Sequence, residues 1–110
     1  LSGGQKQRLS IARAYIKKAP IMILDDAVSA VDVKTEEIIL NNLKEKRKGL
    51  TTLVVASRVS TIEKMDRIIV LNNGEVEAFD THENLLKISP TYLRMVTLQQ
   101  LEKEAGDYYG

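Results

Sequence analysis

The sequence predicts an α/β fold, in which a mostly parallel sheet is flanked by helices and followed by a β-hairpin. Two short apolar runs, Ile21–Leu24 and Leu53–Ala56, have the length and composition of strands that are buried on both faces. Between them, residues 33 to about 48 place apolar side chains among charges, which is typical of an amphipathic helix, and Gly49 ends it. The tripeptide Asn72-Asn73-Gly74 is a strong signal for a hairpin turn.

The other elements are predicted from caps and helix-breaking residues. In chain order they are a helix that begins near Gln5, a short helix at Thr61–Met65, strands at Arg67–Leu71 and Glu75–Phe79, a helix capped by Thr81, and a last amphipathic helix after Pro90. Residues 106–110 are expected to form a disordered tail.

Length and composition narrow the class of protein. A chain of 110 residues is large enough for one small domain with a core. Its 16 basic and 15 acidic residues nearly balance, so the charge gives no field suited to binding nucleic acid. Cysteine is absent, so disulfides play no part and a reducing compartment is allowed. No apolar run approaches the roughly 18 residues of a membrane span, and no signal peptide is visible.

Two features invite a functional interpretation that the sequence does not favour. The basic residues Lys44, Lys46, Arg47 and Lys48 cluster near the end of a predicted helix, where such side chains are usually solvated and compensate the helix dipole. The only histidine, His82, is expected in the first turn of a helix rather than at a catalytic position.

Ser2, Gly3 and Gly4 stand just before the first helical pattern. Glycines let the backbone come close to a ligand, and the free N–H groups at the positive end of a helix attract an anion, to which Ser2 adds a hydroxyl. Taken alone, the tripeptide is better explained as a simple helix cap. The residues that follow favour the phosphate-binding interpretation.

Asp25 and Asp26 follow directly after the apolar run Ile21–Leu24. Open α/β sheets bind ligands at the carboxyl ends of their strands, and two adjacent acids there repel each other unless a cation or solvent relieves them. A metal-bound nucleotide accounts for both this acid pair and the helix start upstream. Without that helix start, a solvated loop would be the preferred explanation.

Taken in order, these segments resemble the C-terminal part of the ATP-binding domain of ABC transporters, which are P-loop NTPases. The resemblance covers nearly the whole chain, and the ordered set of motifs is highly specific although each short motif is weak alone. The matching segments are Leu1–Gln5 (signature motif), Ile21–Asp25 (Walker B), Ser29–Asp32 (D-loop), Val54–Ile62 (switch region), and Asp66–Leu71 with Gly74–Val76 (the strands that follow).

The resemblance implies ATP and Mg²⁺ as ligands of residues 1–105, with Asp25 holding the metal ion through water. ABC domains dimerise head to tail, so the signature motif would complete the ATP site of a second nucleotide-binding domain, and the D-loop would couple the two sites. The implied nucleotide-binding residues are Ser2, Gly3, Gly4, Gln5 and Asp32.

Two implied catalytic positions depart from the family pattern. Asp26 stands where the family has a glutamate that orients the hydrolytic water, and the shorter side chain withdraws the carboxylate by roughly 1 Å, which can cost about a hundredfold in rate. Ser57 stands where the family has a histidine that contacts the γ-phosphate. The chain therefore resembles the degenerate half of a heterodimeric multidrug-type exporter. A homodimer in which Asp26 serves adequately is the alternative.

The 110 residues contain no Gly-x-x-x-x-Gly-Lys-Ser/Thr sequence, so we expect the P-loop to lie upstream, behind a fused transmembrane domain, with the chain at the cytoplasmic face of the cell membrane. The isolated piece is expected to bind ATP weakly or not at all and to be inactive. Its unpaired strands are expected to cause non-native self-association. A soluble ABC ATPase that acts as a mechanical switch on ribosomes or DNA is the other class considered, and the balanced charge disfavours it.

Overall fold

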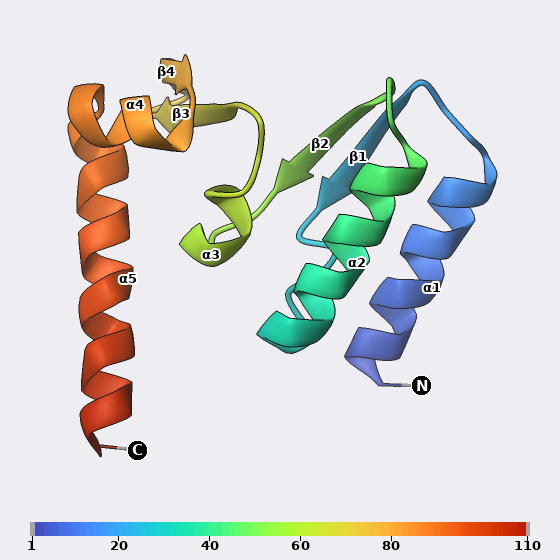
Figure 1. The fold of residues 1–110 in the computed structure, drawn as a ribbon, viewed down its shortest axis with the longest axis horizontal. Coiled ribbons are helices and arrows are strands. Elements are labelled where there is room, and N and C mark those ends of the chain that lie inside the picture. The colour runs from blue at the N-terminus through green and yellow to red at the C-terminus, as the bar shows by residue number, and fades with distance from the viewer. Residues whose placement is uncertain (1, 110) are drawn as a thin grey trace. The chain divides into compact units, whose positions relative to one another are not determined.

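The computed structural model describes the backbone of residues 2–109 and the side chains of residues 2–106. The chain divides into two compact units, Leu1–Ala56 and Ser57–Gly110. Helices and strands alternate in the first unit, and the second unit combines a strand pair with helices (Figure 1), which confirms the predicted α/β class.

The first unit consists of α1 (Gly3–Ile16), β1 (Ile21–Asp25), α2 (Val33–Lys46) and β2 (Thr51–Val55). The two strands pair in parallel, with Ile21 opposite Thr51 and Asp25 opposite Val55. Figure 1 shows the two helices side by side next to this sheet. The connection from β1 through α2 to β2 is the crossover that a parallel pair requires.

The core of the first unit lies on one face of the sheet. Met22 and Leu24 of β1 are buried there, together with Ile11 of α1 and Leu43 of α2. The alternate residues of the strands point the other way and stay exposed, and these are Ile21, Ile23, Leu53 and Val55. The sequence predicted strands that are buried on both faces, and within this chain only one face of the sheet is buried. Parallel sheets are almost always covered on both faces, so the apolar outer face is a surface on which further structure would pack.

Arg47 differs from the expectation for the basic cluster. It is only 3% exposed, because its guanidinium donates hydrogen bonds of 2.9 Å each to the Thr52 hydroxyl, the Ala19 carbonyl and the Thr51 carbonyl. The expectation that all four basic residues are solvated was wrong at this position. Arg47 ties the end of α2 to the segments that begin both strands.

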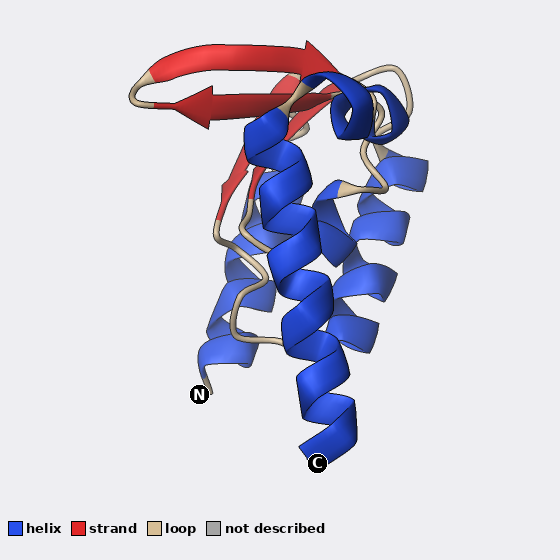
Figure 2. Cartoon of the chain, turned by 90° about the vertical axis from the view of Figure 1, so that its left-hand side faces the viewer, coloured by secondary structure: helices blue, strands red, loops and turns tan. Residues whose placement is uncertain are grey.

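The second unit contains α3 (Val59–Ile62), β3 (Ile68–Asn72), β4 (Glu75–Asp80), α4 (His82–Ile88) and α5 (Pro90–Tyr109). The two strands pair antiparallel in a sheet separate from that of the first unit, with an irregularity in register between Val70 and Leu71. The predicted turn is confirmed, since Asn73 and Gly74 have φ angles of 53° and 76°, the left-handed pair that a two-residue hairpin loop favours. Figure 2 shows this hairpin beside α4 and the start of α5.

Leu85 of α4 and Tyr92 of α5 are fully buried against Ile68 and Val70 of β3. Beyond this core, α5 continues as a long helix whose later apolar residues, such as Leu101, are exposed. The backbone of α5 is helical to Tyr109, and Gly110 lies outside the described residues. The expected disordered tail at residues 106–110 stays a prediction. No helix in the described part of the chain has both the length and the apolar composition that crossing a bilayer requires.

Candidate functional site

The N-terminus of α1 is built by a reciprocal cap. The Ser2 hydroxyl accepts a hydrogen bond from the Gln5 backbone N–H at 3.1 Å, and the Ser2 N–H donates to the Gln5 side-chain oxygen at 2.9 Å. The helix begins at Gly3, two residues earlier than the sequence predicted, because this cap extends it. The N–H groups of Gly3 and Gly4 donate to no other group among the described residues, so they remain available to an anion.

The two glycines also allow close packing within the first unit. A Cβ atom at Gly4 would lie 3.2 Å from both the Ala30 carbonyl oxygen and a methyl group of Val31, and one at Gly3 would lie 3.3 Å from the Ala30 Cβ. Neither glycine has a positive φ angle, so they are needed here for space rather than for an unusual backbone conformation. The helix start therefore packs directly on the loop that follows Asp26.

Gln7 connects the same helix to that loop through its side-chain amide. Its nitrogen donates to the Asp26 carbonyl and to the Ser29 hydroxyl, both at 3.0 Å, and its oxygen accepts from the Ala30 N–H at 2.8 Å. Sequence reasoning missed this residue. The one available signal was spacing, since positions 3, 4 and 7 share one face of a helix.

Asp25 and Asp26 lie at the carboxyl end of β1, as predicted. Asp26 has a φ angle of 54°, in the left-handed region that few residues other than glycine adopt. Hydrogen bonds hold it there, because its N–H donates to the Val55 carbonyl at 3.0 Å and its own carbonyl accepts from Gln7 and Ser29. Backbone strain of this kind is concentrated at functional sites.

The Asp25 carboxylate is exposed, and it makes no hydrogen bond or ion pair within the described part of the chain. Among the side chains of residues 2–106, no group of three potential ligands of the His, Cys, Asp or Glu type could hold a metal ion by itself. Mg²⁺ is usually bound through one or two carboxylates while phosphates and waters complete the shell, so this site fits an ion that arrives with a nucleotide.

Asp32 is the N-cap of α2, and its side chain accepts a hydrogen bond from the Thr35 N–H at 3.4 Å. The Thr35 side chain lowers the pKa of the Asp32 carboxyl most, burial opposes this shift, and the Thr35 N–H lowers the pKa further. The residue is therefore a carboxylate at neutral pH, exposed in the loop that Gln7 holds.

Ser57 belongs to the second unit, and it is exposed. Its hydroxyl has no partner among the residues that the structure describes, whereas its carbonyl accepts a hydrogen bond from the Gln99 side chain at 2.7 Å. The backbone is thus fixed while the hydroxyl is free.

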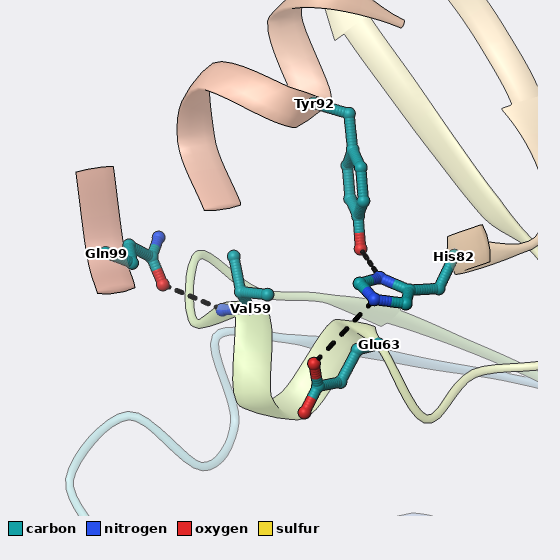
Figure 3. A network of polar contacts seen from close by, with 5 residues as sticks. All are labelled: Val59, Glu63, His82, Tyr92 and Gln99. Atoms are coloured by element: carbon teal, nitrogen blue, oxygen red, sulfur yellow. Dashed lines mark hydrogen bonds and ion pairs between the residues drawn. The ribbon is translucent and has the colours of Figure 1, made fainter. Parts of the chain in front are cut away.

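His82 is the first residue of α4, where the sequence placed it, and Thr81 caps the helix as predicted. His82 Nδ1 lies 2.7 Å from the Tyr92 hydroxyl, and Nε2 lies 4.0 Å from the Glu63 carboxylate (Figure 3). Burial, together with the charges of Glu63 and Glu83, raises the pKa of the Tyr92 hydroxyl, which therefore keeps its proton. This histidine links α4 to α5 and to the end of α3.

Comparison with known proteins agrees with this geometry. A family model described as ABC transporter matches residues 1–29. The chain is 49% identical to mouse ATP-binding cassette sub-family B member 5 over 87% of its own length and 8% of that protein. It is 46% identical to an ATP-dependent lipid A-core flippase of Syntrophus aciditrophicus, over all of this chain and 18% of that protein. A bacterial Atm1-family ABC exporter solved with ATP bound matches with a TM-score of 0.85 and 40% identity, over 90% of this chain and 18% of that one.

The helix start, the acid pair and the loop between them define a segment of an ABC-type P-loop ATPase domain. The chain belongs to the ABC transporter family, and within it to the ATP-binding domain of the exporter type. It spans less than a fifth of the length of the relatives named above.

Proposed function

We propose that this chain works within an exporter's ATP-binding domain, which hydrolyses ATP at the cytoplasmic face of the cell membrane to move a substrate across it. The observation that carries this proposal is the connection through Gln7. The hydrogen bonds of its side-chain amide join the start of α1 to the backbone of Asp26 and Ala30. The phosphate-binding end of the helix and the acid pair therefore move together. Hydrogen-bonded connections of this kind can carry coupling between two ATP sites.

In this proposal each residue has a defined task. The N–H groups of Gly3 and Gly4, with the Ser2 hydroxyl and Gln5, bind the phosphates of ATP seated mainly on a second ATP-binding domain. Asp25 holds Mg²⁺ on this chain's own nucleotide, and that ion neutralises charge on the phosphates. Asp32 approaches the partner domain. The membrane-crossing part belongs to a transmembrane domain, which we expect to be fused upstream.

We further propose that this chain's own ATP site turns over slowly. Asp26 supplies a shorter carboxylate than the glutamate expected at its position, and Ser57 cannot supply an imidazole. The exposed hydroxyl of Ser57, which has no partner among the described side chains of residues 2–106, is consistent with weak phosphate contact rather than with proton transfer. The chain would then donate an intact signature motif to a partner that hydrolyses ATP, while its own ATP acts as a clamp.

The test measures ATP hydrolysis by the complete transporter that contains this chain and its partner. Ser2→Ala or Gly4→Asp is expected to remove most of the turnover, whereas Asp26→Asn is expected to change it little. Because Ser2→Ala also removes a helix cap, worth about 1 kcal/mol, Thr81→Ala is the matched control, since it removes the same kind of cap from α4. The opposite ranking would contradict the proposal.

The homodimer alternative makes a different prediction in the same experiment. There Asp26→Asn and Ser2→Ala would each remove most of the turnover, because every site needs both groups. The soluble alternative, a switch on ribosomes or DNA, would show ATPase activity that depends on RNA or DNA rather than on a transported substrate. Self-association of the isolated chain, through the unpaired edges of its strands, stays a prediction.

A further inference from the structure

The Gln99 side chain spans the backbone of the segment that begins with Ser57. Its amide nitrogen donates to the Ser57 carbonyl at 2.7 Å, and its amide oxygen accepts from the Val59 N–H at 2.8 Å. Gln99 lies on α5, 42 residues from Ser57. Figure 3 shows the side chain reaching from α5 to the start of α3. One amide therefore fixes both sides of the residue between them, Arg58.

The second of these bonds replaces a missing helix cap. Arg58 is the N-cap residue of α3, and its side chain makes no capping hydrogen bond. Val59 is the first residue of that helix and is buried, so its N–H would otherwise be costly to leave without an acceptor. Helix α3 has only four residues, too few to be stable without tertiary contacts. Gln99 thus provides from α5 what the local sequence does not.

The other end of α3 is held from the same side. Glu63 is its C-cap residue, and the Glu63 carboxylate faces His82, which in turn contacts the Tyr92 hydroxyl of α5 (Figure 3). Tyr92 is fully buried and so provides a rigid support. The segment Ser57–Ile62, here named the switch segment, is therefore connected to α5 at both ends.

We infer that Gln99 is a positioning residue for Ser57. The Ser57 hydroxyl has no partner among the described residues, so its direction depends on the backbone that Gln99 fixes. This inference rests on the proposed function, in which Ser57 faces the γ-phosphate of this chain's own ATP. Gln99 then determines how firmly that ATP is held, although it touches neither substrate nor metal.

The test compares Gln99→Leu with Gln100→Leu in the complete transporter. Gln100 lies next along α5 and is exposed, and its side chain makes no hydrogen bond within the part of the chain that the structure describes. Its variant therefore carries the same chemical change without the lost contacts. The first readout is hydrogen–deuterium exchange of a peptide that includes the Val59 amide. Gln99→Leu is expected to speed that exchange by about tenfold, and Gln100→Leu by less than about twofold.

The second readout is the rate at which pre-bound ATP leaves the slow site during a chase with unlabelled ATP. We expect about tenfold faster release in Gln99→Leu than in Gln100→Leu, with similar thermal unfolding midpoints for the two. Gln99→Glu separates the two bonds, since its carboxylate still accepts from Val59 but repels the Ser57 carbonyl. It should keep the Val59 amide protected and still release ATP faster.

Unchanged exchange at Val59 in Gln99→Leu would overturn the inference whatever the activity. Faster exchange with unchanged ATP release would also overturn it, because Gln99 would then be structural only. A wild-type protein without slowly released ATP would instead refute the proposed slow site. In that case the turnover rate replaces ATP release as the readout for Gln99, and equal turnover in the two leucine variants would overturn the inference.

Discussion

Replacing Arg47 tests whether a residue that resembles solvated surface charge is part of the core. Arg47→Met keeps most of the aliphatic stem and removes the guanidinium, whose three hydrogen bonds reach Thr52, Ala19 and Thr51. Lys48→Met is the matched control. Its ammonium makes one ion pair, 3.7 Å from Glu45, and both side chains are at least 75% exposed.

The magnitude follows from burial. A hydrogen bond to a charged group contributes about 1.5–3 kcal/mol, so three additive bonds would give about 5–9 kcal/mol. The actual loss is smaller, because Thr51 is exposed and can bond water, and because removing a buried cation relieves its desolvation. We expect Arg47→Met to lower the free energy of unfolding by about 2–4 kcal/mol, and Lys48→Met by less than about 0.5 kcal/mol.

The assay is equilibrium urea unfolding of the ATP-binding domain that contains this chain, with the slope of the transition checked for each variant. Arg47→Lys keeps the charge, but its ammonium reaches at most one or two of the three acceptors. Its loss of unfolding free energy should therefore fall between those of Arg47→Met and Lys48→Met. Equal unfolding free energies for Arg47→Met and Lys48→Met would refute the reasoning.

Two further outcomes follow from the geometry. Gly4→Ala brings a Cβ within 3.2 Å of the Ala30 carbonyl, so we expect a loss of about 1 kcal/mol in unfolding free energy, whereas Gly106→Ala, with nothing within 4 Å, should gain up to about 1 kcal/mol; a gain in both would contradict the packing argument. The hydroxyl of Ser89, and after it that of Thr91, lowers the pKa of the Glu77 carboxyl below its ordinary 4.5. The stability that the Glu77 carboxylate contributes is therefore complete above pH 4.5 and is lost as the pH falls through the lower native pKa. Unfolding midpoints of wild type and Glu77→Gln should therefore converge as the pH falls below 4.5, and parallel curves would contradict this assignment.

Elements defined by local signals could be predicted from the sequence. The Asn73-Gly74 turn needs two left-handed residues, which these two types favour, and Thr81 caps its helix through its own side chain. The β1 strand was predicted to within one residue because its apolar run and the following acids mark both ends. In each case the physical cause lies within a few residues of the effect.

Contacts between distant segments could not be predicted in this way. Helix α3 begins at Val59 rather than at Thr61 because an amide on α5 caps it. Arg47 is buried partly because one of its three acceptors, the Ala19 carbonyl, comes from a segment 28 residues away. For the candidate site, the phosphate-binding helix start and the acid pair were recognised from residue type and order. The role of Gln7 was not, since its partners lie at least 19 residues away.

The backbone at Asp26 restricts which substitutions this position can accept. With a φ angle of 54°, it favours glycine, asparagine and aspartate, because a Cβ atom in the left-handed region costs about 1–2 kcal/mol and only a short polar side chain can offset part of that cost by bonding the local backbone. In directed evolution toward faster ATP hydrolysis, the backbone conformation at position 26 would therefore exclude most substitutions before their catalytic chemistry mattered. Libraries that vary the neighbouring loop together with position 26 should yield active clones more often than saturation mutagenesis of that codon alone.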